Sequence, residues 1–497
     1  MTRTRWSNKT YQPLDASAAL SMKSHDNPLG PPAAESDSII LCSTSQGYSV
    51  RATPLRITRD VVVFEVYNPY SILQLSEVLT TFKIIVDDQL IYSGRATVSN
   101  LVNTGIMLVC EASLEEGWSD VDLFSLVSQP TKLRADFRKF LQHCERIHSI
   151  QPQYKVVVAD MQNYFTELKR WLEHIELGIR SIPSTDRSKT ESSVINELAP
   201  SLLPSIDSLF GRFEETAAGV PVQLLPSHRN YAKRQLHPHL LCSPFAYRTY
   251  HKPLGYAGDY EMVNMILRDP NEGSTLFSKI INAWFLSQSP AGAHRNRISY
   301  LTDLLIDETL RARRNSKVAK IFNLGCGPAR EIQNFLIRDE VCNDADFVLF
   351  DFNEETIQHT ARVLENLKTK YNRKTNIEVI KKSVHHVLKQ AHRPAPGYDM
   401  VYCAGIFDYL SDRICKQLMN IFYELLEPGG LLVATNVESS NPSRNGMESL
   451  LEWHLIYRTP LQLKQLIPDR APARSSTLKT DATGINIYLE VRKPDDV

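Results

Sequence analysis

The chain has 497 residues, which is too many for one hydrophobic core, so we expect two or three domains. Apolar residues make up 42% of the chain and charged residues 23%, values that are ordinary for a globular protein. Because 56 Lys and Arg residues balance 56 Asp and Glu residues, no bulk charge favours nucleic acid, and we expect no nucleic-acid partner.

The first predicted elements are a disordered lead and a β domain. Residues 1–37 are polar and rich in Pro and Ser, which is typical of disorder. From 38 to 128, short runs rich in β-branched residues have a period near two, and turn residues such as Asn68-Pro69 and Asp87-Asp88 separate them. Several strands of this length and spacing predict a small antiparallel barrel or sandwich.

Residues 129–310 have helical periodicity and are predicted to form a cap or linker region. One apolar helix face runs from Leu133 to Ile147. A heptad-spaced apolar stripe follows between Val158 and Ile179. It fits the seam of a homodimeric coiled coil or an intramolecular helical hairpin, and at this length we favour the hairpin. Residues 181–193 are polar and are predicted to form a mobile loop. The heptad-spaced stripe consists of Val158, Met161, Phe165, Leu168, Leu172, Ile175 and Ile179.

From 311 to 497, strands and helices alternate, which predicts a parallel sheet with helices on both faces. An apolar strand at 318–324 ends in Gly325-Cys326-Gly327, and helix-forming sequence follows. The glycines let the backbone approach a ligand closely, and the helix start offers free N–H groups. A second strand ends at Asp351, 24 residues beyond Gly327, where doubly wound folds place an acid that binds a ribose.

Three further strands and a hairpin complete this predicted domain. The third strand, at 377–380, precedes Ser383, and the fourth, at 399–404, continues into Gly405. An amphipathic helix then ends at Pro428-Gly429-Gly430, before a fifth strand at 431–435. The last two apolar runs, joined at residues 481–484, predict a β-hairpin.

This series resembles the class I S-adenosyl-L-methionine (SAM)-dependent methyltransferases over residues 317–495. Leu324 to Glu331 have the form L-G-x-G-x-x-x-E of that family's first motif, and the sheet of the family ends in such a hairpin. A dinucleotide-binding fold would have a third glycine where this chain has Arg330. The resemblance implies an α/β, Rossmann-like class I methyltransferase domain with a C-terminal β-hairpin, and SAM as its cofactor.

The resemblance also implies which residues bind the cofactor. Gly325 and Gly327 correspond to the turn under the methionine part of SAM. Asp351 corresponds to the acid that binds the ribose, and Asn353 is expected near the ribose or the adenine. Ser383 is expected at the adenine amine, where the family often has an acid.

Four more residues are expected around the methionine part of the cofactor. Ala404 and Gly405 end the fourth strand, beside the expected position of the sulfonium. Asn323 stands where the family commonly has Asp or Glu, and its amide can still form hydrogen bonds. Arg295, in the helix before the first strand, is expected to reach the SAM carboxylate; the alternative is that it lies on a solvated helix face.

The segment 244–266 contains the run Gly255-Tyr256-Ala257-Gly258-Asp259-Tyr260. Two glycines, two tyrosines and a carboxylate within six positions can form a loop that lies against a ligand. The alternative is a structural turn in which Asp259 caps the helix that follows.

Together with the β domain and the class I core, this segment resembles the bacterial extracellular-factor, 3-hydroxypalmitic acid methyl ester biosynthesis proteins. That resemblance implies methylation of a small-molecule acceptor, a fatty-acid carboxylate. A carboxylate needs no general base, but it needs cations or hydrogen-bond donors, and the candidates are Arg248, His251, Lys252, Tyr256 and His294. An amine or hydroxyl acceptor would need a base, for which the candidates are His251, Asp259 and His454. The candidate catalytic residues are therefore His251, Tyr256, Asp259 and His454.

The β domain loosely resembles PilZ domains, which bind cyclic di-GMP through R-x-x-x-R and D/N-x-S-x-x-G. Here Arg51 and Arg56 are one residue too far apart, and the second motif has Val102 in place of Ser between Asn100 and Gly105. Because both motifs are damaged, we favour a barrel that serves architecture or partner contact without cyclic di-GMP.

Two functional classes remain after these observations. The first is a bacterial SAM-dependent methyltransferase, and the alternative is a non-catalytic signalling protein whose methyltransferase-like domain senses SAM. The histidines show no metal-ligand spacing, so no metal site is expected. The eight cysteines form no C-x-x-C pair, no apolar stretch has the length of a membrane helix, and the N-terminus lacks a secretory apolar core. These features predict a cytoplasmic protein.

Overall fold

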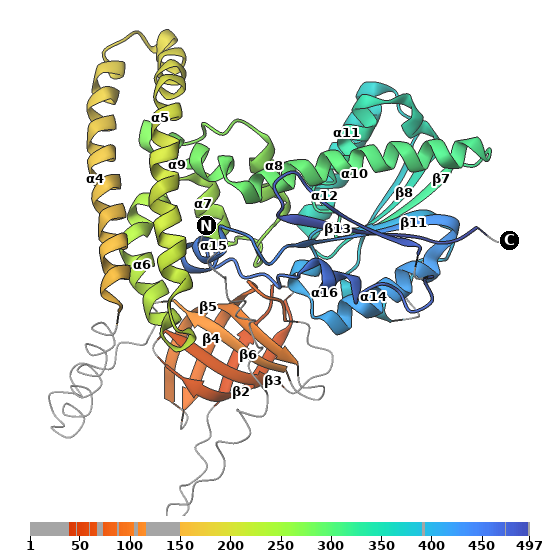
Figure 1. Ribbon diagram of the computed structural model, residues 1–497, viewed down its shortest axis with the longest axis horizontal. Helices are drawn as coiled ribbons and strands as arrows, with labels where there is room; N and C mark the ends of the chain where they lie inside the picture. The colour runs from red at the N-terminus through yellow and green to blue at the C-terminus, as the bar shows by residue number, and fades with distance from the viewer. Residues whose placement is uncertain are drawn as a thin grey trace, which may run out of the picture.

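The computed structural model describes residues 39–45, 47–58, 60–66, 73–86, 89–103, 108–115, 150–389, 393–472 and 474–495. Three units lie side by side in it: a β-barrel, a group of long helices and a seven-stranded sheet with helices on both faces (Figure 1). The predicted lead at 1–37 and the predicted helix from Leu133 to Ile147 lie outside the described residues.

The barrel confirms the predicted small antiparallel β domain. Its strands close in the order β1-β2-β3-β6-β5-β4, so no sheet edge is left open. Alternate side chains point inward and form the barrel core, including Ile40, Phe64, Phe82 and Tyr92. The strands are β1 (Ile39–Ser43), β2 (Ser49–Ile57), β3 (Val61–Val66), β4 (Val78–Val86), β5 (Gln89–Asn103) and β6 (Leu108–Leu114).

The long helices α4 (Pro152–Arg180) and α5 (Ser184–Ala218) form an antiparallel hairpin. The heptad-spaced stripe of α4 packs inside the chain, against α5, α6 (Leu225–Leu240) and α9 (Leu276–Ser287), so it is not available as a dimer seam. The predicted hairpin is therefore confirmed. The described helices that follow α6 in this region are α7 (Pro244–His251), α8 (Tyr260–Leu267) and α10 (Ser289–Arg314).

The predicted loop at 181–193 is wrong, because α5 begins at Ser184. Pro183 precedes the first turn, where proline is compatible with a helix start. Arg187 donates to the carbonyl oxygens of Ile182 and Arg180 (2.9 and 2.7 Å) and ties that turn to the end of α4. Packing of Ile195 against the helical core then stabilises a helix that its polar sequence did not predict.

The sheet has the order β12-β13-β11-β10-β7-β8-β9. Neighbours from β11 to β9 are parallel, and β13 runs antiparallel to both β11 and β12, as the predicted closing hairpin requires. The strands are β7 (Ala319–Leu324), β8 (Ala345–Asp351), β9 (Asn376–Lys381), β10 (Tyr398–Cys403), β11 (Leu426–Val437), β12 (Ser476–Thr480) and β13 (Asn486–Arg492).

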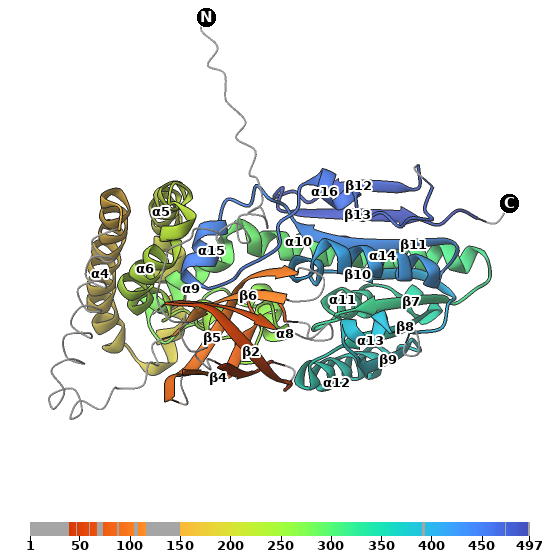
Figure 2. The same ribbon diagram turned by 90° about the horizontal axis from the view of Figure 1, so that it is seen from below.

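Helices lie on both faces of this sheet (Figure 2), and each face has its own apolar core. The helices of one face are α10, α11 (Arg330–Arg338) and α12 (Glu354–Tyr371). Those of the other are α13 (Val384–Leu388), α14 (Asp412–Leu425) and α16 (Pro460–Lys464). A further helix, α15 (Arg444–Leu450), packs against α5 and α6 and so joins the sheet unit to the long helices.

The chain reverses its direction across the sheet between β7 and β10. From β7 it proceeds to β8 and β9, and it then returns to the other side of β7 with β10 and β11. In parallel sheets, ligands bind at the carboxyl ends of the strands at such a reversal. The fold therefore places the expected ligand site at the carboxyl ends of β7 and β10.

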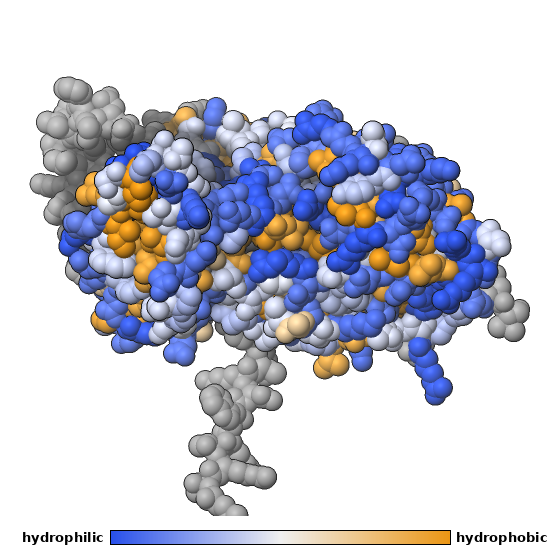
Figure 3. Space-filling view, turned by 90° about the horizontal axis from the view of Figure 1, so that it is seen from above, coloured by the Kyte–Doolittle hydropathy of each residue, from blue (hydrophilic) through white to orange (hydrophobic). Residues whose placement is uncertain are grey.

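Polar residues cover most of the face seen in Figure 3, and the apolar residues there form separate patches. Among the described helices, none combines the length and the apolarity that a membrane crossing requires.

Candidate active site

The turn after β7 has the backbone geometry that its glycines predicted. Gly325 has a φ of +76° and Gly327 a φ of +50°, both in the region that favours glycine. A Cβ atom at Gly325 would lie 2.1 Å from the Cδ1 atom of Ile406, so a side chain there cannot be accommodated without movement. At Gly327, no described atom lies within 4 Å of the Cβ position, so this backbone faces open space.

Asp351 closes the turn from the neighbouring strand. Its Oδ2 accepts from the backbone N–H of Gly327 (3.1 Å), and its Oδ1 accepts from that of Asn353 (3.1 Å). Burial raises the pKa of this carboxyl, and the backbone hydrogen bonds act in the opposite direction. The carboxylate is thus held at the end of β8 beside the glycine turn, which is the geometry expected for a ribose-binding acid.

A cavity of about 1060 Å³ opens at the carboxyl ends of β7, β8 and β10. It continues from the glycine turn to the helical unit, and the barrel residues Thr44, Tyr48, Ser49 and Val50 line another part of it. Small-molecule sites typically have volumes of about 300–1,000 Å³. This cavity therefore has room for a nucleoside-sized cofactor and a second ligand.

Most of the predicted cofactor residues lie in the wall of this cavity. The exceptions are Asn353 and Arg295. The side chain of Asn353 caps α12 by accepting from the N–H of Thr356 (2.9 Å), and Arg295 donates to the carbonyl oxygens of Ile266 and Leu286 (3.2 and 3.0 Å). The predicted residues that line the cavity are Asn323, Gly325, Gly327, Asp351, Ser383, Ala404 and Gly405.

Arg297, two residues beyond Arg295, is the arginine of α10 that lines the cavity. Its side chain is 8% exposed, and its guanidinium lies against Gly405, since a Cβ atom there would be 3.3 Å from Nη1. The guanidinium has no hydrogen bond or ion pair within the described residues, and its charge acts to lower the pKa of the buried Glu331 and Asp408 carboxyls. The helix rather than the sequence decides which of the two arginines turns inward.

Asn323 offers an unpaired acceptor at the same end of the cavity. Its Nδ2 donates to the carbonyl oxygen of Tyr402 (3.2 Å), while its buried Oδ1 has no partner among the described residues. Because buried polar atoms are rarely left unpaired, this oxygen marks a position for a ligand donor.

Tyr256 lies over the cofactor end of the cavity. Its ring packs against Phe352, and its hydroxyl is 3.4 Å from the Oγ1 of Thr356. Burial and the nearby Asp351 carboxylate raise its pKa. The adjoining Gly255 accepts through its carbonyl from the N–H of Val78 (2.7 Å), so this loop connects the cavity to the barrel.

Asp259 does not line the cavity. It caps α8 by accepting from the N–H of Met262 (2.8 Å), and it forms an ion pair with Arg248 (2.9 Å). The structural alternative for Asp259, a helix cap, is confirmed. The paired Arg248 is likewise absent from the cavity wall formed by the described residues.

The two histidines predicted as catalytic also lie outside the cavity wall. His251 stacks on Tyr247, with ring centroids 4.0 Å apart, and its Nδ1 bonds the Tyr247 carbonyl. His454 is buried beside Glu448, and burial lowers its pKa well below the usual value. Hence the structure brings only Tyr256 of the four predicted catalytic residues to the cavity.

Two cavity residues, Asp408 and Tyr409, were not singled out from the sequence. Asp408 accepts from the N–H of Val437 (2.7 Å), and burial raises its pKa to about 6. Tyr409 accepts from the indole N–H of Trp453 (2.9 Å), and all three side chains line the cavity. A usable signal was present, because Asp408 and Tyr409 follow the fourth strand at the reversal of the sheet.

His294 completes this end of the cavity, one helical turn before Arg297 on the same face of α10. Its Nδ1 bonds the carbonyl oxygen of Pro290 (2.9 Å), and its ring lies 6.5 Å from that of Trp453. Within the part of the chain that the structure describes, no cluster of His, Cys, Asp and Glu side chains could hold a metal ion.

Comparisons with known proteins agree with this geometry. Residues 315–469 match a family described as "Methyltransferase domain". A search of curated proteins found no match to the chain.

Solved structures resemble parts of the chain at low identity. A possible exported protein from Bordetella parapertussis is 16% identical, with 60% of this chain and 97% of that chain covered and a TM-score of 0.41. Magnesium protoporphyrin IX methyltransferase from Synechocystis with bound SAM is 10% identical, with 46% and 90% covered and a TM-score of 0.31. The N-methyltransferase NodS from Bradyrhizobium japonicum is 14% identical, with 50% and 100% covered and a TM-score of 0.30.

Likenesses of this size carry no argument about activity. The family match, the order of the sheet and the glycine turn with its acid rest on this chain's own residues. They identify the C-terminal part of the chain as a class I methyltransferase domain that uses SAM as its methyl donor.

Proposed function

We propose that this protein transfers the methyl group of SAM to a small molecule with an apolar body. The observation that carries the proposal is one continuous cavity, which runs from the glycine turn to an aromatic wall in the helical unit. The cofactor occupies the end formed by β7, β8 and β10, and the acceptor enters the remaining volume.

Each part of SAM has a matching group in the cavity wall. Asp351 accepts the ribose hydroxyls, and Ser383 lies beside the adenine. The Oδ1 of Asn323 accepts from the α-ammonium of the methionine part, and Arg297 binds its carboxylate. Within the described residues, the Asn323 oxygen has no partner and the Arg297 guanidinium has no hydrogen bond or ion pair, so both can bind the cofactor.

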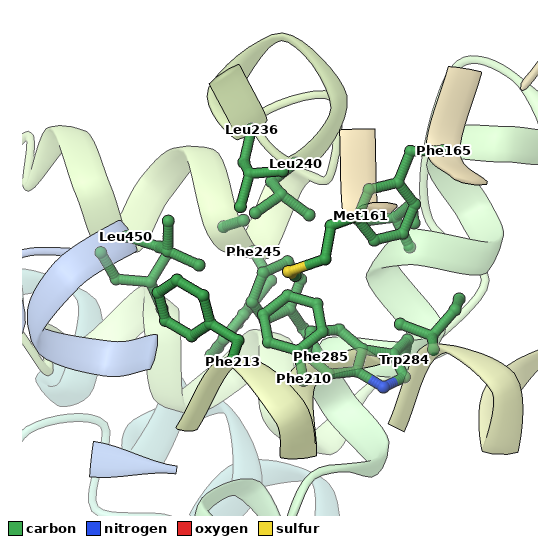
Figure 4. Close-up of a cluster of buried hydrophobic side chains, with 14 of the residues drawn as sticks. Met161, Phe165, Phe210, Phe213, Leu236, Leu240, Phe245, Trp284, Phe285 and Leu450 are labelled. Carbon is green, nitrogen blue, oxygen red and sulfur yellow. The ribbon is translucent and has the colours of Figure 1, made fainter. Parts of the chain in front are cut away.

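The acceptor body lies against the aromatic wall. Phe210 stacks on Trp284 with ring centroids 4.0 Å apart, and Phe245, Phe285 and Leu450 gather around them (Figure 4). The indole N–H of Trp284 is satisfied by a side-chain acceptor, so the rings present apolar faces. The alkyl chain of a fatty acid, which the resemblance implies, is one body of this kind.

Methyl transfer from a sulfonium is an in-line displacement, and its catalysis is largely positioning. The cavity supplies that positioning, because cofactor and acceptor share one enclosed space between three packed units. The barrel contributes by closing the cavity rather than by binding cyclic di-GMP. Ser76 of the barrel accepts from and donates to the backbone of His454 (2.5 and 3.0 Å), which fixes the barrel against the acceptor end.

Calorimetry with SAM and transfer of label from methyl-labelled SAM to a lipid extract test this proposal. Asp351→Ala should abolish both SAM binding and product formation. Asp303→Ala, which removes an exposed carboxylate of α10, is the matched control and should change neither. The proposal fails if the wild-type protein does not bind SAM, a result that would favour the non-catalytic alternative.

A further inference from the structure

We infer that the methyl acceptor is a neutral amine on an apolar body and that His294 positions it by accepting a hydrogen bond from its N–H. This inference rests on the proposed function and names the substrate class of the same site. It differs from the fatty-acid carboxylate that the resemblance implies.

The tautomer of His294 is determined by its hydrogen bond. Because the carbonyl oxygen of Pro290 can only accept, the Nδ1 of His294 must carry the hydrogen. The Nε2 atom is then a bare acceptor, and no described residue bonds to it. Burial and the charge of Arg297 lower the pKa of His294 to about 3, so the ring is neutral at physiological pH. The cavity therefore presents an acceptor here, which suits a ligand that donates.

The charges around His294 disfavour an anionic acceptor. Asp408 lines the same cavity within electrostatic range of Arg297 and Tyr409, and only one of its carboxylate oxygens has a partner among the described residues. Arg297 is the adjacent cation, and the SAM carboxylate neutralises it under the proposed function. Arg330 and the lysines of the β9–α13 segment line the cofactor side instead. An acceptor carboxylate would therefore face Asp408 and a histidine lone pair without a free cation of its own.

An amine gains from the same surroundings as the reaction proceeds. Its lone pair forms the new N–C bond while the C–S bond breaks, and the electron pair of that bond goes to sulfur. Positive charge moves from sulfur to nitrogen, where Asp408 and the rings of Trp453 and Tyr409 stabilise it. The product leaves as the N-methylammonium ion, and S-adenosylhomocysteine is the other product.

A hydroxyl acceptor fits this geometry less well. A hydroxyl must lose its proton to become a good nucleophile, and His294 is too weak a base for that task because its pKa is far below neutrality. An alkylammonium ion gives one proton to water as it enters the cavity, which costs far less than deprotonating an alcohol, and the neutral amine then attacks. Its N–H needs only an acceptor that orients the lone pair toward the methyl group, and Nε2 provides one.

Three probes with the same alkyl chain test the head group: octylamine, octan-1-ol and octanoate. Each is incubated with the full chain and methyl-labelled SAM, and its affinity is measured calorimetrically in the presence of S-adenosylhomocysteine. We expect label in a base-stable N-methyl product from octylamine and tighter binding of octylamine than of octanoate. Label in a base-labile ester, label in an ether, or failure to methylate octylamine would each overturn the inference. Direct SAM binding keeps the proposed function separate from these outcomes.

Variants of His294 test its positioning role. His294→Ala should raise KM for octylamine about tenfold, the effect of one lost hydrogen bond, with a smaller change in kcat and an unchanged affinity for S-adenosylhomocysteine. His294→Gln keeps a side-chain oxygen and should restore part of the loss. His174→Ala is the matched control, because His174 makes the same bond to the carbonyl four residues earlier but lies exposed on α4. Equal KM values for wild type and His294→Ala would refute the role.

Discussion

Replacement of Arg297 tests the proposed contact with the SAM carboxylate. The guanidinium is 8% exposed and has no hydrogen bond or ion pair within the described residues. We propose that its partner is the SAM carboxylate. Arg297→Gln removes the cation and leaves a polar side chain of smaller volume.

The expected loss in affinity follows from the loss of one charged interaction in a buried site. Hydrogen bonds to charged groups contribute roughly 1.5–3 kcal/mol. We therefore expect a loss of about 2–3 kcal/mol, which corresponds to a rise in Kd of about 30- to 150-fold for S-adenosylhomocysteine. The guanidinium also stabilises the buried Glu331 and Asp408 carboxylates, since its charge lowers the pKa of both, so the Tm of the unliganded variant should fall at neutral pH.

Calorimetry with two ligands makes this test specific. S-adenosylhomocysteine carries the carboxylate, whereas methylthioadenosine lacks the whole amino-acid part. Arg297→Gln should weaken only the first ligand, and Arg314→Gln, at the exposed end of α10, should weaken neither. An unchanged Kd for S-adenosylhomocysteine, or an equal loss for both ligands, would show that Arg297 does not bind the carboxylate.

Four further outcomes are expected. Gly325→Ala should lower the free energy of unfolding by more than the ~1 kcal/mol that an unfavourable φ costs, because its Cβ would overlap Ile406. Gly484 has a similar φ with open space around it, so Gly484→Ala should cost only that ~1 kcal/mol. Urea unfolding of the two variants measures the difference. Burial raises the pKa of Asp351, so the folded state holds this proton to a higher pH than the unfolded chain, and ionisation of Asp351 opposes folding above that pKa. Asp351→Asn should therefore keep or raise the Tm at pH 7. Calorimetry should show at least about tenfold weaker binding of S-adenosylhomocysteine to this variant. Ser76→Ala should lower the free energy of unfolding by about 1–3 kcal/mol, since it removes both bonds between the barrel and the loop after α15, and an unchanged urea midpoint would contradict this. Cyclic di-GMP should cause no thermal shift, and a clear shift would contradict the architectural role of the barrel.

The sheet domain was predictable because its signals are local. The apolar strand before Gly325 and the strand that ends at Asp351 each stand out in a short window of sequence. Parallel pairing then places the ends of both strands together, as the bond from Gly327 to Asp351 shows. The cofactor end of the site therefore followed from the spacing of a few residues.

The acceptor end was not predictable in the same way, because it is assembled from segments that are distant in the sequence. Asp259 and His454 have chemistry that suits catalysis, but the fold uses one as a helix cap and buries the other beside Glu448. His294 and Arg297 reach the cavity because of the rotation of α10, which depends on its packing against neighbouring elements.

By itself, the sequence determined the barrel, the alternating strands and helices, and the glycine turn with its acid, since periodicity and turn chemistry act over a few residues. Only the tertiary structure decided which arginine and which histidine of α10 line the cavity. The physical reason is that a side chain's chemistry is encoded locally, whereas its direction and its partners depend on how distant elements pack.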